Sequence, residues 1–137
     1  MQITIDNPAG AAQPAGPYSQ VARIDLGTGS LIFLSGQVAL DENNDAAFPG
    51  DMAAQAESIF QTISDLLAAH GATLADIVNV RSFLTDMSQR AEYSRVRARY
   101  LSEPLPTSTT VEVSKLFSDG AVIEIEVVAA VSRPSGG

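Results

Sequence analysis

The run Ile123-Glu124-Ile125-Glu126-Val127 alternates apolar and acidic side chains, and this alternation constrains the fold more than any other feature. Successive side chains of a β-strand point to opposite faces of the sheet, so the apolar residues share one face and the glutamates the other. The apolar face requires a covering layer. The opposite face then meets solvent or another subunit. Val21, Leu31 and Phe33 are further apolar positions that we expect the covering layer to leave open, which favours self-association.

Two segments with helical periodicity supply that covering layer. Apolar side chains recur at helical spacing over residues 51–70, where Asp51 is a suitable N-cap and Gly71 a suitable stop. A second helix is predicted to begin near Asp86, which is placed to form a capping box with Gln89. The apolar stripe of this second helix consists of Tyr93, Val96 and Tyr100.

The remaining periodic segments predict strands, which flank and separate the two helices. They cover residues 1–5, 18–26, 31–34, 77–84, 107–113 and 122–131. This order predicts an α+β fold of two layers, with a mixed β-sheet packed against two helices. Length favours a single domain over residues 1–137, with a disordered tail from about residue 132 to 137.

The charge balance makes nucleic acid an unfavourable partner. Sixteen acidic and eight basic residues give a net charge of −8, which repels phosphate. Half of the basic charge falls in the second predicted helix, at Arg90, Arg95, Arg97 and Arg99. A solvated helix face paired with acidic neighbours is the favoured interpretation of this cluster, and an anion or RNA contact is the alternative.

The expected compartment and cofactors follow mainly from features that the sequence lacks. No apolar run approaches the roughly 18 residues that span a bilayer, and the first residues do not resemble a secretory signal. We therefore expect a cytoplasmic protein without a membrane partner. The chain has no cysteine, which excludes disulfides and thiol catalysis. The acidic segment Asp41–Asp45 resembles the start of a calcium loop, but Ala46 and Met52 stand where glycine and glutamate are required, so we expect no metal.

Candidate chemistry falls on polar residues in apolar surroundings. His70 is the only histidine and ends the first predicted helix, where a structural role is favoured over a catalytic triad. Tyr18 and Ser35 stand beside glycines, and Ser108 and Thr110 follow a proline. Glu124 is flanked by isoleucines, which predicts a raised pKa and a role as general base or water activator. The alternative is a partly solvated or paired carboxylate.

The same segments carry a resemblance to the RidA/YjgF family. The matching stretches follow in order over nearly the whole chain: GPYSQ at 16–20, SGQ at 35–37, a glycine followed by DIV at 71–78, FLTDM at 83–87, a proline-to-VEV stretch at 106–113 and IEIE at 123–126. No single stretch identifies the family, but the ordered set of stretches is specific to it.

The resemblance implies a chorismate-mutase-like fold, a homotrimer, and clefts between neighbouring subunits. Family deaminases hydrolyse reactive enamines and imines to 2-oxo acids and ammonia, without a metal or an organic cofactor. Carried over by position, Tyr18, Ser35 and Gly36 would line the cleft, and Glu124 would hold or activate the attacking water.

Two departures from the family pattern concern the substrate. The resemblance implies an arginine at the position of Ser108 and an asparagine at that of Arg90. An arginine would bind a substrate carboxylate through a bidentate pair, whereas serine offers one neutral hydrogen bond. Arg81 and Arg90 are candidate replacement cations, and a surface salt bridge is the alternative for each.

The sequence therefore predicts an enamine or imine hydrolase that acts on a small reactive intermediate other than a standard 2-imino acid. Glu124 would position water, while Tyr18, Ser35, Ser108 and Thr110 would orient the substrate. The alternative is a non-catalytic trimer that binds a small molecule or regulates a partner. A ribonuclease or translation inhibitor is disfavoured by the negative charge and by the lack of a catalytic histidine.

Overall fold

The alternating strand lies at the centre of the sheet. In the computed structural model, which describes residues 1–133, β6 (Ile123–Ser132) pairs with β3 (Gly29–Leu34) on one side and with β4 (Ile77–Leu84) on the other. Ile123, Ile125, Val127 and Ala129 of β6 are buried under the helices, whereas Glu124 and Glu126 are half-buried on the opposite face. Most of the predicted disordered tail lies outside the described residues.

Six strands form one mixed sheet in the order β1-β2-β3-β6-β4-β5. The other three strands are β1 (Gln2–Asp6), β2 (Val21–Asp25) and β5 (Thr107–Glu112). Every neighbouring pair is antiparallel except β4 and β5, which are parallel. Parallel neighbours need a crossover connection, and the chain between β4 and β5 supplies it as a helix. The predicted mixed sheet is confirmed.

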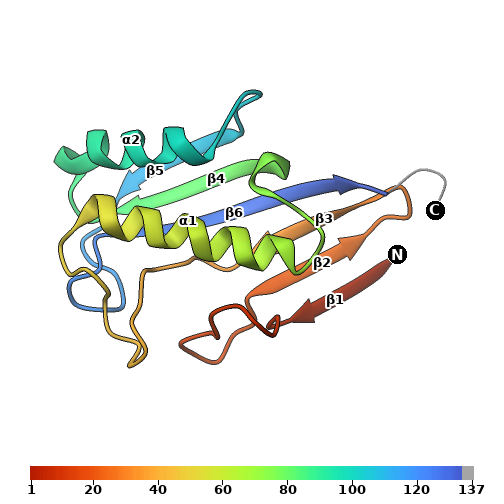
Figure 1. Cartoon of the computed structure of the whole chain (residues 1–137), viewed down its shortest axis with the longest axis horizontal. Helices are drawn as coiled ribbons and strands as arrows, with labels where there is room; N and C mark the ends of the chain where they lie inside the picture. The colour runs from red at the N-terminus through yellow and green to blue at the C-terminus, as the bar shows by residue number, and fades with distance from the viewer. Residues whose placement is uncertain (134–137) are drawn as a thin grey trace.

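Both helices cover the same face of the sheet, so the protein has two layers (Figure 1). The helices are α1 (Met52–Ala68) and α2 (Arg90–Tyr100), with short 3₁₀ turns at Leu74–Asp76 and Met87–Gln89. The side chain of Asp51 accepts from the backbone N–H of Ala54, as predicted for an N-cap. Within residues 1–133, no helix is long and apolar enough to cross a membrane.

Two local predictions are wrong in detail. Asp86 accepts hydrogen bonds from the backbone and the hydroxyl of Ser88, so it caps a 3₁₀ turn instead of forming a capping box with Gln89. Val21 is buried with 1% of its surface exposed, because it pairs with Leu34 on the face that the helices cover. Of the apolar positions expected on the open face, Phe33 is there and is 40% exposed.

A buried glutamine ties the loops beside the sheet to α1. Gln55 has no exposed surface, and its Nε2 donates to the carbonyls of Ala47, Phe48 and Gly120 at 2.8–3.1 Å. Its Oε1 accepts from the backbone N–H of Val122 at 2.9 Å. One side chain therefore satisfies backbone groups of two loops, and it fixes the segment that enters β6.

Replacing this glutamine by leucine should destabilise the protein strongly. Gln55→Leu leaves buried backbone groups without partners, and each such group costs about 1–3 kcal/mol, so we expect a loss of at least about 2 kcal/mol. Urea unfolding at a fixed protein concentration measures this loss. The matched control is Gln61→Leu, at an exposed position of the same helix. Equal midpoints for the two variants would show that the Gln55 contacts are not important.

Candidate functional site

A cleft of about 530 Å³ opens on the sheet face that the helices leave uncovered, next to the glutamates of β6. It is lined by Ala15, Gly16, Tyr18, Ser35, Gly36, Phe117, Glu124 and Glu126. Four segments that are far apart in the sequence contribute to it: the loop before β2, the end of β3, the loop after β5, and β6 itself. The structure therefore brings together Tyr18, Ser35, Gly36 and Glu124, four of the residues predicted for the site.

The segment after β3 is bound along β6 by its backbone. The N–H of Gln37 donates to the carbonyl of Ile125 at 2.8 Å, and the N–H of Ile125 donates back at 3.0 Å. The side chain of Gln37 is buried and donates to the carbonyl of Ser35 at 3.0 Å. These bonds hold Gly36 directly beside Glu124.

Gly36 allows the close approach of the glutamate. A Cβ at this position would lie 2.7 Å from Oε2 of Glu124 and 2.8 Å from its carboxyl carbon. Real Cβ atoms do not approach other heavy atoms so closely, so any side chain here would displace the carboxyl group. The glycine therefore sets where the Glu124 carboxyl lies in the cleft.

Ser35 fixes the loop that carries Tyr18. Its hydroxyl donates to the carbonyl of Ser19 at 2.6 Å, and its backbone N–H donates to the carbonyl of Gln20 at 2.9 Å. The hydroxyl proton is thereby used within the protein, but the oxygen can still accept a hydrogen bond from a ligand. Tyr18 is 45% exposed and lines the cleft.

The electrostatics of the cleft disfavour a charged Glu124. Burial raises the pKa of the Glu124 carboxyl, and the negative charge of Glu126 raises it further. Arg81 does not line the cleft, but it lies on the same face of the sheet, with its Nη1 3.4 Å from Oε1 of Glu126. Arg81 thus forms an exposed ion pair with the second glutamate, as the alternative interpretation of this arginine supposed.

The other predicted site residues lie on the helix side of the sheet. Ser108 pairs with Val80 and Thr110 pairs with Ser82, and both partners belong to the face that carries the core. Glu124 is on the opposite face, where it pairs with Phe83. Arg90, the first residue of α2, is exposed, and like Ser108 and Thr110 it does not line this cleft.

Four lining residues were not predicted, and one of them, Gly16, was noticed only as part of a motif. Phe117 is 63% exposed in the loop between β5 and β6, where an aromatic residue outside the predicted helices and strands was a usable signal. Glu126 was noticed only as part of the alternation. Ala15 lines the cleft by its position in the loop before β2 and carries no chemical signal in the sequence.

The remaining polar candidates have structural partners. Nε2 of His70 lies 3.0 Å from Oδ1 of Asp6, which joins the end of α1 to β1. Oδ1 of Asp41 accepts the backbone N–H groups of Asn43 and Asp45, so the acidic segment is a turn. Residues 1–133 contain no cluster of three or more histidine, aspartate or glutamate side chains placed to hold a metal ion.

The fold and the cleft define a class: a two-layer α+β protein with a carboxylate-lined cleft, of small-molecule size, on its open sheet face. The family model described as Endoribonuclease L-PSP matches residues 9–131. The chain therefore belongs to this family, which is the RidA/YjgF family that the motifs predicted.

Individual relatives are similar to this chain over most of their length. A RutC family protein of Pyrococcus horikoshii is 35% identical over 119 residues, which cover 87% of this chain and 90% of the relative. A protein of Acinetobacter baylyi named 3-aminoacrylate deaminase RutC is 35% identical, covering 90% of this chain and 94% of that protein. The crystal structure of RidA from an Antarctic Psychrobacter is 32% identical, covers 93% of this chain and 99% of its own, and has a TM-score of 0.80.

The raised pKa of Glu124 predicts that this residue destabilises the protein at neutral pH. The folded state binds the proton more tightly than the unfolded state, whose reference pKa is 4.5, so stability falls as pH rises from about that value through the folded pKa. Glu124→Gln removes the ionisation. We expect this variant to gain stability relative to the wild type between pH 4 and pH 7.5, as measured by urea unfolding.

The matched control is Glu92→Gln, at an exposed position of α2. It should follow the wild type across the same pH range. A Glu124→Gln variant that loses stability relative to the wild type as pH rises would show that the carboxylate is stabilised in the cleft, contrary to the account above.

Proposed function

We propose that this protein is an enamine or imine hydrolase that acts on a small reactive intermediate. The observation that carries the proposal is the carboxyl group of Glu124, which lies against Gly36 in a small-molecule cleft and has a raised pKa. A carboxyl group with a pKa shifted toward neutrality exchanges protons effectively at physiological pH. The relative named 3-aminoacrylate deaminase supports the same reaction class.

In this reaction water adds to the carbon of a C=N bond and ammonia leaves. The Glu124 carboxylate accepts a proton from water as the oxygen attacks and passes it to the nitrogen, which gives a carbinolamine. It then accepts the proton of the new hydroxyl group and passes it to the nitrogen, as the C=O bond forms, the C–N bond breaks and ammonia leaves. The sum is one imine and one water giving one carbonyl compound and one ammonia. An enamine enters the same route after protonation at carbon. Tyr18 and the Ser35 oxygen can orient the substrate by hydrogen bonds.

The proposed site includes a second copy of the chain. Ser108 and Thr110 lie on the helix side of the sheet, whereas Glu124 lies on the open side, so one chain does not present both sets to one ligand. A homotrimer with clefts between subunits, as the resemblance implies, resolves this separation. The open face offers apolar contacts for such an assembly, since Phe33 and Val111 are 40% and 39% exposed.

Phosphodiester cleavage is a poorer proposal, although the family description contains the word endoribonuclease. Glu124 and Glu126 both line the cleft, and the net charge is −8, so an RNA phosphate would be repelled. A non-catalytic trimer that binds a small molecule remains the alternative. Its signature would be a ligand that binds the cleft and stays unchanged during prolonged incubation.

Loss of the carboxylate should abolish turnover without abolishing folding. We expect Glu124→Gln to lower kcat by about 100-fold or more, which is the usual contribution of a general base. Imines generated in situ by an amino-acid oxidase provide the assay, and semicarbazide traps the imine that remains. Glu92→Gln is the control of matched charge. If Glu124→Gln retains wild-type turnover, Glu124 is not the water activator.

Adding one methyl group at Gly36 should also lower turnover, because it moves the Glu124 carboxyl group. Gly36→Ala displaces the Glu124 carboxyl from its place in the cleft, so we expect kcat to fall by about tenfold or more while the fold is retained. Circular dichroism and the assay above measure the two quantities. A Gly36→Ala variant with wild-type kcat would mean that the close approach is not part of the mechanism.

A further inference from the structure

Arg97 lies against the strand residue that the resemblance assigns to an arginine. Its Nη1 donates to Oγ of Ser108 at 2.9 Å and to the hydroxyl of Tyr93 at 3.3 Å. The guanidinium carbon lies 5.9 Å from the centre of the Tyr93 ring, and that ring is buried. A cation therefore stands beside Ser108, but it is carried by α2 instead of β5.

The partners of this guanidinium are neutral, although acidic side chains outnumber basic ones by two to one in the chain. Arg81 and Arg99 form ion pairs with Glu126 and Glu57, whereas no carboxylate within residues 1–133 pairs with Arg97. Two hydroxyl groups and a ring face position the charge without neutralising it. The full positive charge thus remains available to an anion.

The geometry leaves one edge of the guanidinium unused. Both hydrogen bonds come from Nη1, and neither Nη2 nor Nε of Arg97 donates to any residue in 1–133. Nη2 and Nε together form an edge of the planar group that matches the two oxygens of a carboxylate. Arg97 is also partly exposed.

We infer that Arg97 is the specificity-determining residue that binds the anionic group of the substrate, across a subunit interface from Glu124. This inference rests on the proposed function, because Glu124 and Arg97 lie on opposite sides of the sheet within one chain. It also revises the prediction of a substrate without a carboxylate. That prediction treated Ser108 as a lost cation and considered only Arg81 and Arg90 as replacements.

Binding of a carboxylate probe tests the inference without turnover. 2-Oxobutanoate and the neutral 2-oxobutanamide differ in the group that Arg97 would bind, and calorimetry gives Kd for each. We expect the wild type to bind the acid more tightly than the amide, and Arg97→Gln to weaken the acid about tenfold to a hundredfold while leaving the amide unchanged. Equal affinities of the wild type for acid and amide would overturn the inference.

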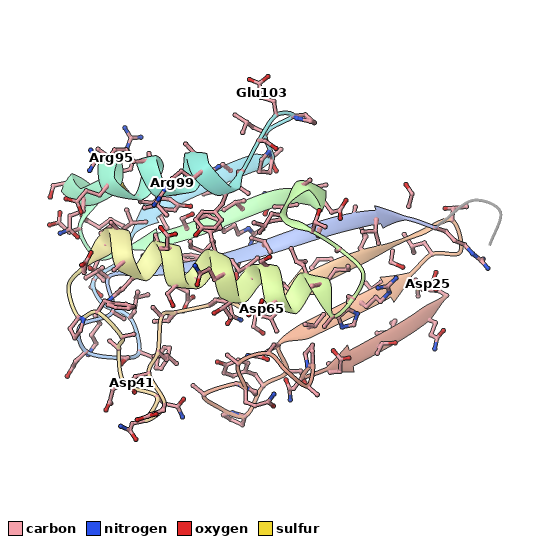
Figure 2. All side chains as sticks on the ribbon, viewed as in Figure 1. Asp25, Asp41, Asp65, Arg95, Arg99 and Glu103 are labelled. Atoms are coloured by element: carbon pink, nitrogen blue, oxygen red, sulfur yellow. The ribbon has the colours of Figure 1, made fainter. Side chains whose placement is uncertain are left out.

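Two further variants distinguish a specific contact of the Arg97 guanidinium from a general effect of its positive charge. Arg95→Gln removes the same charge from the outward side of α2, where Figure 2 shows Arg95, and should leave both affinities unchanged. The exchange variant Arg97→Ser with Ser108→Arg returns the guanidinium to β5 and should restore preference for the acid. If Arg95→Gln weakens the acid as much as Arg97→Gln does, the effect is general electrostatics and the inference is wrong.

Mixed assemblies test the interface. If the two residues act from different subunits, random mixing of Glu124→Gln and Arg97→Gln chains restores about a quarter of the sites, because each such site then takes one intact residue from each kind of chain. No recovery would show that the two residues do not act from different subunits, and it would overturn the inference. Wild-type protein that binds the acid through Arg97 yet hydrolyses no imine would overturn only the proposed hydrolysis.

Discussion

The contact between the backbone at Gly36 and the carboxyl group of Glu124 is the constraint on which the site depends. It exists because Gln37 and Ile125 pair through their backbones, which brings the end of β3 within van der Waals distance of β6. The same pairing closes one side of the cleft and shields part of the carboxyl group from solvent. Position and pKa of the glutamate therefore have one structural origin.

This arrangement works against stability, as functional sites commonly do. Two carboxylates line the cleft, and the nearer arginine pairs with Glu126 and not with Glu124. Among the buried side-chain polar atoms of residues 1–133, Oε1 of Gln20 alone lacks a hydrogen-bond partner, and Gln55 makes four hydrogen bonds to backbone groups. The contrast indicates that the environment of Glu124 is a feature of function and not of poor packing.

The sequence predicts those parts of the fold that follow from local periodicity. The helix predicted over residues 51–70, the strand at 77–84 and the two faces of β6 follow from the spacing of neighbouring side chains. The structure has all three, with the helix as Met52–Ala68. The burial of Val21 was missed because it depends on where α1 lies over the sheet. The cap at Asp86 was missed because Ser88 offers a shorter hydrogen-bonded turn than Gln89.

Only the predicted site residues that lie in the family motifs of the N-terminal half and of β6 line the cleft. Tyr18, Ser35, Gly36 and Glu124 meet in one cleft, but no sequence pattern indicates that Ser108 and Thr110 face the other side of the sheet. That fact requires the register between β4 and β5. The contact of Arg97 with Ser108 joins a helix to a strand across a tertiary packing interface, so spacing along the chain does not reveal it.

The central claim is that the cleft keeps the Glu124 carboxyl partly desolvated and close to a second negative charge. A carbon-13 NMR titration of the side-chain carboxyl of Glu124 tests it directly, with Glu126→Gln measured alongside. The account predicts an apparent pKa above the reference value of 4.5, and a smaller elevation when Glu126 is neutral. A Glu124 carboxyl that titrates at or below 4.5 would contradict it and would leave the glutamate as an ordinary strand carboxylate.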